Sequence, residues 1–275
     1  MQRPWLWLGS TLASLVLLLA LLAPGLAPHD PLRQHRDGLQ AGGAPAPPGG
    51  RFLLGADSLG RDVLSRLIHG ARSSLAVGLG GTAIAIGLAL LVGVGAGYSG
   101  GRLEQGLMQL TDVFMAFPPI LLAVALAAAL PQRSLTSLML VVGFLTWPGP
   151  ARVFRSETLS LKERLYVEAA RALGASRPRI LLHHVLPALA PTTLALGSLA
   201  TATTILLDAG LSFLGVGIPP PHPTWGAMLQ EARSWYTLAP WLAFWPGLAV
   251  VLSVAAFHFI AFDLSRPARA SGAGL

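Results

Sequence analysis

Tyr166-Val167-Glu168-Ala169-Ala170-Arg171-Ala172-Leu173-Gly174 lies inside a charged segment at residues 151–191. The segment holds seven Lys and Arg and three Glu, whereas the long stretches on both sides are apolar. Charges inside hydrocarbon cost several kcal/mol each, so we expect the segment to lie in water between membrane-spanning blocks. Good helix formers up to Leu173, followed by Gly174, predict a helix that ends in a turn.

The composition of this segment suits docking better than chemistry. Glu168 places one carboxylate beside Ala169 and Ala170, whose small side chains let another protein approach the backbone closely. Ser176 is positioned to cap the next turn, and Pro178 falls near its first helical position, where a missing N–H costs nothing.

The spacing resembles the EAA loop of ABC-importer permease subunits: Glu168-Ala169-Ala170, three residues, Gly174, and later Leu186-Pro187. In that family the loop is a cytoplasmic coupling helix that fits a groove on the ATPase subunit. The resemblance implies that the ATPase is contacted by Glu168, Ala169, Ala170, Gly174, Leu186 and Pro187. The pattern departs at His184, where the family prefers Ile. The alternative is an ordinary charged loop.

Composition excludes a water-soluble globule. Of 275 residues, 53% are hydrophobic and only 11% are charged. The net charge of +7 would suggest nucleic acid in a soluble protein, but no basic patch with interleaved aromatic residues appears, so no nucleic-acid partner is expected. Basic residues that collect in membrane-protein loops explain the charge better. Zero cysteines exclude disulfides and thiolate metal sites.

The apolar blocks predict an all-α, polytopic membrane protein with six transmembrane helices and a cytoplasmic helical coupling loop at 151–191. We expect spans near residues 5–23, 75–98, 113–130, 135–150, 192–217 and 241–262. Residues 1–74 would comprise the first span, a linker and an amphipathic segment, and residues 75–275 the permease domain. The first block also resembles a signal peptide. Its length, and Pro24-Gly25 where a cleavage site should lie, favour a retained span.

An amphipathic stretch at residues 54–72 precedes the second span. Four apolar residues share one helical face, which predicts a short helix at the membrane interface: Leu64, Leu67, Ile68 and Ala71. We expect Asp57 or Ser58 to cap it and an Asp62–Arg66 pair to support it. The stretch also resembles the signature before the second span in the C-type subunits of dipeptide, oligopeptide and nickel permeases.

Small residues recur every four positions in the second span. They are Gly81, Ala85, Ala89, Gly93 and Gly97. This spacing lets two membrane helices approach closely and predicts a packed seam; a helix that merely tolerates glycine is the alternative. Near the C-terminus, three aromatic residues predict an interfacial belt: Trp225, Trp235 and Tyr236.

Three residues are candidates for the translocation path. Pro118 and Pro119 remove two backbone donors and should kink the third span, which is tolerated only against protein or a water-lined path. Asp208 lies inside the fifth span, where an acid is expected to be functional. It either lines the path or hydrogen-bonds another helix, and His258 is a weaker candidate for its partner.

Charge distribution gives a weak orientation. Six spans put both termini on the side of the charged segment, which collects eleven Lys and Arg, including Arg3, Arg266 and Arg269, against eight on the other side. Six of those eight lie in the long first loop, which carries less weight than short connections. Both termini are therefore expected to be cytoplasmic, as the EAA resemblance also implies.

No Gly-x-x-x-x-Gly-Lys-[Ser/Thr] motif is present, so energy for uphill transport must come from a partner. The resemblance implies a permease subunit of an ATP-driven importer for peptides or peptide-like solutes in a bacterial inner membrane. Its expected partners are a second permease, two ATP-binding subunits, an extracytoplasmic solute-binding protein and membrane lipid. No catalytic residue, metal or cofactor is expected. The alternatives are cargo such as nickel or glutathione, and an intramembrane enzyme that uses Asp208 with His258.

Overall fold

The computed structural model describes residues 4–266, so Arg3 and Arg269 lie outside the described residues. Within this range the chain forms helices and loops, with isolated β-bridges but no strand. The α-helices are α1 Pro4–Leu21, α2 Ala23–Leu26, α3 Val63–Ser99, α4 Gly101–Ala116, α5 Pro119–Ala129, α6 Leu135–Thr146, α7 Pro148–Leu161, α8 Leu165–Ala172, α9 Arg177–Ile180, α10 Leu186–Ala188, α11 Ala190–Phe213, α12 Trp225–Ala232 and α13 Trp241–Leu264. A 3-10 turn, η1, spans Arg36–Gly38, and a π-helical turn, η2, spans Leu181–Val185.

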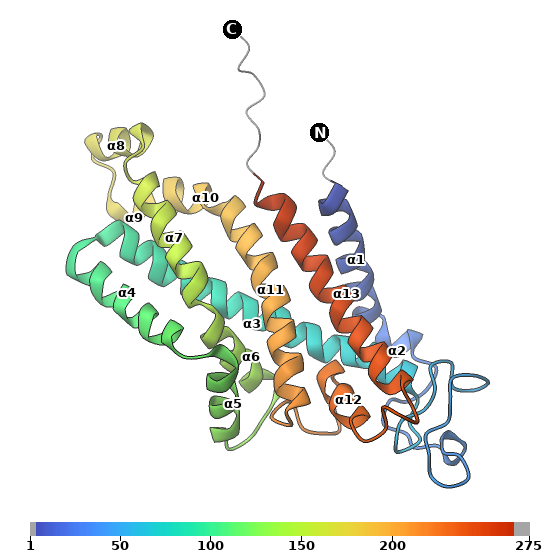
Figure 1. The fold of residues 1–275 in the computed structure, drawn as a ribbon. Helices are drawn as coiled ribbons and strands as arrows, with labels where there is room; N and C mark the ends of the chain where they lie inside the picture. Colours follow the sequence, from blue (N-terminus) through green and yellow to red (C-terminus); the bar gives the residue numbers. More distant parts are fainter. Residues whose placement is uncertain (1–3, 267–275) are drawn as a thin grey trace.

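Four described helices are long and apolar enough to cross a membrane: α1, α3, α11 and α13. The pairs α4–α5 and α6–α7 meet the same test together, which gives six spans when each bent pair is one span. The prediction of an all-α polytopic membrane protein is confirmed. Figure 1 shows that α1 begins and α13 ends at the end of the molecule where α8 projects, while α12 and the long first loop lie at the opposite end.

The amphipathic stretch is not a separate interfacial helix, and that expectation is wrong. Its residues 63–72 form the first turns of α3, which runs for 37 residues without a break because no proline lies between Ile68 and Leu75 and Gly70 is tolerated within the helix. The cap is Asp62, not Asp57 or Ser58: its side chain accepts a hydrogen bond from the Ser65 amide at 2.9 Å.

The predicted Asp62–Arg66 pair is not formed. Arg66 instead pairs with Asp57 and with Glu231 on α12, and Arg61 pairs with the same two carboxylates. Arg66 is 4% exposed and Asp57 is 3% exposed, so the four side chains make a largely buried ionic cluster, Asp57–Arg61–Arg66–Glu231. The cluster ties the start of α3 to α12.

The third span is broken rather than kinked. α4 begins at Gly101, and Phe117 and Pro118 separate it from α5, which is bent away from α4 by 89°. Proline at the start of α5 explains the break, because its missing N–H and fixed φ suit a first helical position but not a helix interior.

The fourth span continues into the charged segment. α6 and α7 meet at 48° beside Trp147-Pro148, and α7 extends to Leu161, eleven residues beyond the predicted end at residue 150. About the first quarter of the predicted coupling loop, residues 151–161, is therefore the end of this bent span.

The predicted seam on α3 is confirmed, and α6 and α7 fill it. Ala85 and Ala89 are fully buried. A Cβ built on Gly93 would lie 2.3 Å from the Ala151 carbonyl oxygen, and one on Gly97 would lie 2.7 Å from the Arg155 carbonyl oxygen. The helices are thus in backbone contact along the seam. The aromatic-belt prediction is wrong for Trp225, which is 2% exposed and donates its indole N–H to the Leu67 carbonyl.

Candidate functional site

Three buried apolar residues of the charged segment pack α8 and its neighbours against the rest of the bundle. Val167 and Val185 are fully buried and Ile180 is 1% exposed, and all three belong to a core cluster with Val94 and Phe154. The segment is therefore anchored to α3 and α7 rather than loosely attached. In Figure 1 α8 projects from one end of the bundle, beyond α7.

Gly174 ends α8 as the sequence predicted. Its φ is +84°, a left-handed conformation that strains any residue with a Cβ. The Gly174 amide donates to the Arg171 carbonyl and the Ala175 amide to the Ala170 carbonyl, both at 3.0 Å, which is the Schellman arrangement. Ser176 precedes α9, but its side chain makes no capping hydrogen bond.

The outer face of α8 carries both apolar and charged side chains. Leu165 is 84% exposed and Leu173 is 89% exposed, values unusual for leucines at the two ends of a helix anchored on a core. Glu168 and Ala169 are exposed beside them, whereas Ala170 packs against the core. The exposed face of α8, with Glu168 between two uncovered leucines, has the composition of a contact surface for another protein.

Leu186 and Pro187 lie at the return to the bundle. The π-helical turn η2 precedes them, and Pro187 is the second residue of α10, where its missing N–H is tolerated. Leu186 packs against the core cluster and Pro187 is exposed. His184, the departure from the EAA pattern, is half-buried with its ring centroid 6.1 Å from that of Tyr166.

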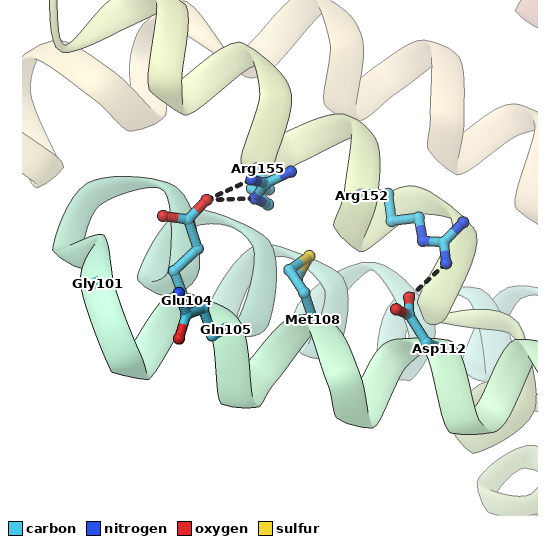
Figure 2. A pocket seen from close by; sticks show the side chains of 7 residues that line it. All are labelled: Gly101, Glu104, Gln105, Met108, Asp112, Arg152 and Arg155. Carbon is cyan, nitrogen blue, oxygen red and sulfur yellow. Dashed lines mark hydrogen bonds and ion pairs between the residues drawn. The ribbon is translucent and has the colours of Figure 1, made fainter.

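Two ion pairs join α4 to α7, just before the chain reaches α8 (Figure 2). Arg155 donates from Nε to Glu104 Oε1 at 2.7 Å, and Arg152 pairs with Asp112 two helical turns farther along α4. Between the pairs lies an open cavity of about 520 Å³, which Gln105 and Met108 also line. The pairs hold the broken third span against the continuation of the fourth.

Two more contacts tie the same region to the remaining helices. Lys162 donates to the Gly97 carbonyl at the end of α3 at 3.0 Å, and Thr192 at the start of α11 donates to Glu157 at 2.8 Å. Sequence reasoning did not identify these partners. For the α4–α7 ion pairs the sequence did offer a clue. Arg152 and Arg155 lie on one face of α7, which favours acidic partners on a neighbouring helix.

Asp208 is 1% exposed, and among the described residues neither of its carboxylate oxygens has a hydrogen-bond partner. It shares a buried polar face of α11 with Thr204, which donates to the Gly78 carbonyl of α3 at 2.8 Å. A helix–helix hydrogen bond, one of the two alternatives for Asp208, is absent from the described chain. His258 is exposed and its ring contacts the Val254 carbonyl of its own helix, so the two residues are not joined.

Pro118 and Pro119 are exposed at the break between α4 and α5. The next residue, Ile120, lies near Gly210 on α11: a Cβ on Gly210 would be 3.6 Å from Ile120 Cδ1. The break therefore adjoins the helix that carries Asp208, although Asp208 is buried within the chain and the prolines are exposed on its surface.

The helices define a multi-pass membrane protein, and comparison with known proteins identifies it further. The model of a family described as binding-protein-dependent transport system inner membrane component matches residues 89–266. The di/tripeptide transport system permease protein DppC of Pseudomonas aeruginosa is 40% identical over 252 residues, 90% of this chain and 81% of that protein. The glutathione transport system permease protein GsiD is 40% identical over 213 residues in Pectobacterium atrosepticum (78% of this chain, 70% of GsiD) and 39% over 247 residues in a strain of Escherichia coli (90% and 80%). The chain belongs to this family of transport-system membrane components.

Proposed function

We propose that the chain is a permease subunit of an ATP-driven importer in a bacterial inner membrane, and that α8 is its docking element for an ATP-binding subunit. The observation that carries the proposal is the exposed face of α8. Val167 and the Gly174 turn hold α8 in place, yet Leu165 and Leu173 are uncovered. We infer that a partner protein covers these two leucines. Family membership supports this, since such components serve transport systems.

The contacts of α7 and Lys162, which precede α8 in the chain, support a role for this region in transmitting motion to the spans. Motion imposed on α8 would pass to α4 through Glu104 and Arg155, to α3 through Lys162 and to α11 through Thr192. ATP-driven closure of the partner subunits would then rock the spans between inward and outward access. The path would lie between this chain and a second permease, with Pro118, Pro119 and Asp208 as candidates for residues that shape it.

Peptides or peptide-like solutes are the proposed cargo, delivered by an extracytoplasmic binding protein. The names of the similar DppC and GsiD proteins support this class, and glutathione is itself a small peptide. Both termini would be cytoplasmic, on the side of α8. The alternative of an intramembrane enzyme required Asp208 and His258 to act together. It is weakened because no contact joins these two residues in the described chain.

Glu168→Lys and Gly174→Pro test the docking role. Proline cannot adopt the φ of +84°, and it lacks the amide N–H that Gly174 donates to the Arg171 carbonyl. It should therefore disrupt the turn after α8. Both variants should reach the membrane at normal abundance. Uptake by the assembled transporter should fall by about tenfold or more, because an ion or turn lost at the centre of an interface costs at least about 1.4 kcal/mol.

Glu163→Lys is the matched control, since it makes the same charge change at an exposed position before α8. It should leave uptake within about twofold of the wild type, as rim charges contribute little. The measurement is solute uptake in parallel with co-purification of the ATP-binding subunit. Unchanged uptake and co-purification in both the Glu168 and Gly174 variants would remove α8 from the docking surface.

A further inference from the structure

A second cavity lies at the end of the molecule opposite α8. It has a volume of about 220 Å³ between α12, the start of α3, and the loops that precede α6 and α12. The lining is polar and rich in hydrogen-bond donors: Arg61, Arg66, Arg133, Ser212, His222 and Gln230. Among the residues that the structure describes, Glu231 is the one acid that lines it.

The charges around this cavity do not balance. Asp57 and Glu231 neutralise Arg61 and Arg66: Arg61 donates to Asp57 at 2.7 Å, and Arg66 donates to Glu231 at 2.5 and 2.9 Å. Arg133 is the remaining cation at the cavity. Its one hydrogen bond in the described chain goes to the Gly215 carbonyl at 2.7 Å, and no carboxylate there pairs with it. The cavity thus carries one uncompensated positive charge.

A buried hydroxyl at the cavity also lacks a partner. Ser212 is 3% exposed, lines the cavity and makes no hydrogen bond through Oγ in the described chain. Buried polar groups are normally satisfied, so an orphaned hydroxyl and an arginine without a carboxylate partner, both lining one cavity, indicate a ligand that supplies acceptor atoms. A planar, bidentate acceptor with one negative charge fits an arginine best, and a carboxylate is such a group.

The size of the cavity limits what enters. Sites for drug-sized molecules measure roughly 300–1,000 Å³, so 220 Å³ admits one terminal residue rather than a whole peptide. The rim is formed by rigid elements: three consecutive prolines, Pro219, Pro220 and Pro221, and α12, which the ionic cluster fixes to α3. A site held in this way is preorganised for its ligand.

We propose that this cavity binds the free α-carboxylate of the transported peptide, with Arg133 as its charge partner and Ser212 as a hydroxyl donor. The inference rests on the proposed function for the direction of transport and the nature of the cargo. The site would receive the carboxyl end of a peptide as it leaves the extracytoplasmic binding protein, and so would favour solutes with a free C-terminus.

Binding by the full chain in lipid nanodiscs tests this, with saturation-transfer NMR and two probes, trialanine and trialanine amide. Trialanine should bind at least about tenfold more tightly than its amide, because only the acid forms an ion pair with arginine. Arg133→Gln should abolish the preference and Arg133→Lys should keep most of it. Arg36→Gln, which removes an exposed cation from the first loop, should change nothing.

Equal binding of the two probes by the wild type, or an unchanged preference in Arg133→Gln, would overturn the proposal. If Arg133→Gln fails to fold, Ser212→Ala gives a second reading: loss of its hydroxyl should weaken trialanine binding several-fold, and unchanged trialanine binding would overturn the proposal. The assay contains neither ATP nor ATP-binding subunits. A negative result together with normal coupling through α8 would therefore eliminate the carboxylate site alone.

Discussion

Replacing Arg66 with alanine is expected to lower the free energy of unfolding by about 3–5 kcal/mol, the usual cost of breaking a buried ion pair from one side. Arg66 is 4% exposed and is shared by Asp57 and Glu231. Its loss leaves Asp57, which is 3% exposed, with Arg61 as its one remaining cation among the described residues, and removes an ionic contact between α12 and the start of α3. Unfolding by titration with dodecyl sulfate in mixed micelles, followed by tryptophan fluorescence, measures the change.

Arg51→Ala is the matched control. Arg51 also pairs with an aspartate, Asp37, at 2.8 Å, but the two side chains are 49% and 56% exposed. Water screens such a pair, so its removal should cost less than about 1 kcal/mol. Equal effects of Arg66→Ala and Arg51→Ala would mean that the ionic cluster does not hold the α12 end of the bundle together.

Gly93→Ala is expected to destabilise the protein by about 1–3 kcal/mol, the range for overpacking a close-packed interior. The added Cβ would meet the Ala151 carbonyl oxygen at 2.3 Å and Phe154 Cβ at 2.8 Å, and backbone cannot rotate away as a side chain can. α3 and α7 must therefore separate, which also strains the neighbouring Lys162–Gly97 contact. The same unfolding titration measures this effect.

Gly87→Ala provides the comparison within α3. A Cβ at Gly87 meets nothing within 4 Å, so the substitution should be neutral or stabilise the helix by up to about 1 kcal/mol. Equal destabilisation by both variants would show that α3 resists any added methyl group and that the seam with α7 is not specific.

Much of the fold followed from hydropathy and from the charged segment. The apolar blocks predicted the membrane helices, the four-residue spacing from Gly81 to Gly97 predicted the packed seam, and Gly174 predicted the left-handed end of α8. These features depend on local composition or on a periodicity within one helix. A single sequence contains both kinds of information.

Features that depend on partners distant in the sequence were missed. Asp62 and Arg66 have the spacing of an i,i+4 pair, but Glu231, 165 residues away from Arg66, offers a bidentate partner in a buried setting. Likewise, Trp225 has the composition of an interfacial residue, yet Leu67 supplies a buried carbonyl for its indole. The Glu104–Arg155 and Asp112–Arg152 pairs require α4 and α7 to lie side by side, which no local pattern reveals.

The most direct test of the central claim, that α8 lies on the cytoplasmic side where an ATP-binding subunit docks, is cysteine labelling. The chain has zero cysteines, so Ser176→Cys beside α8 and Ser234→Cys after α12 each introduce a single exposed thiol. A membrane-impermeant maleimide should label the Ser234 variant in intact spheroplasts. It should label the Ser176 variant only in inside-out vesicles washed free of peripheral proteins. Labelling of the Ser176 variant from outside intact spheroplasts would contradict the account.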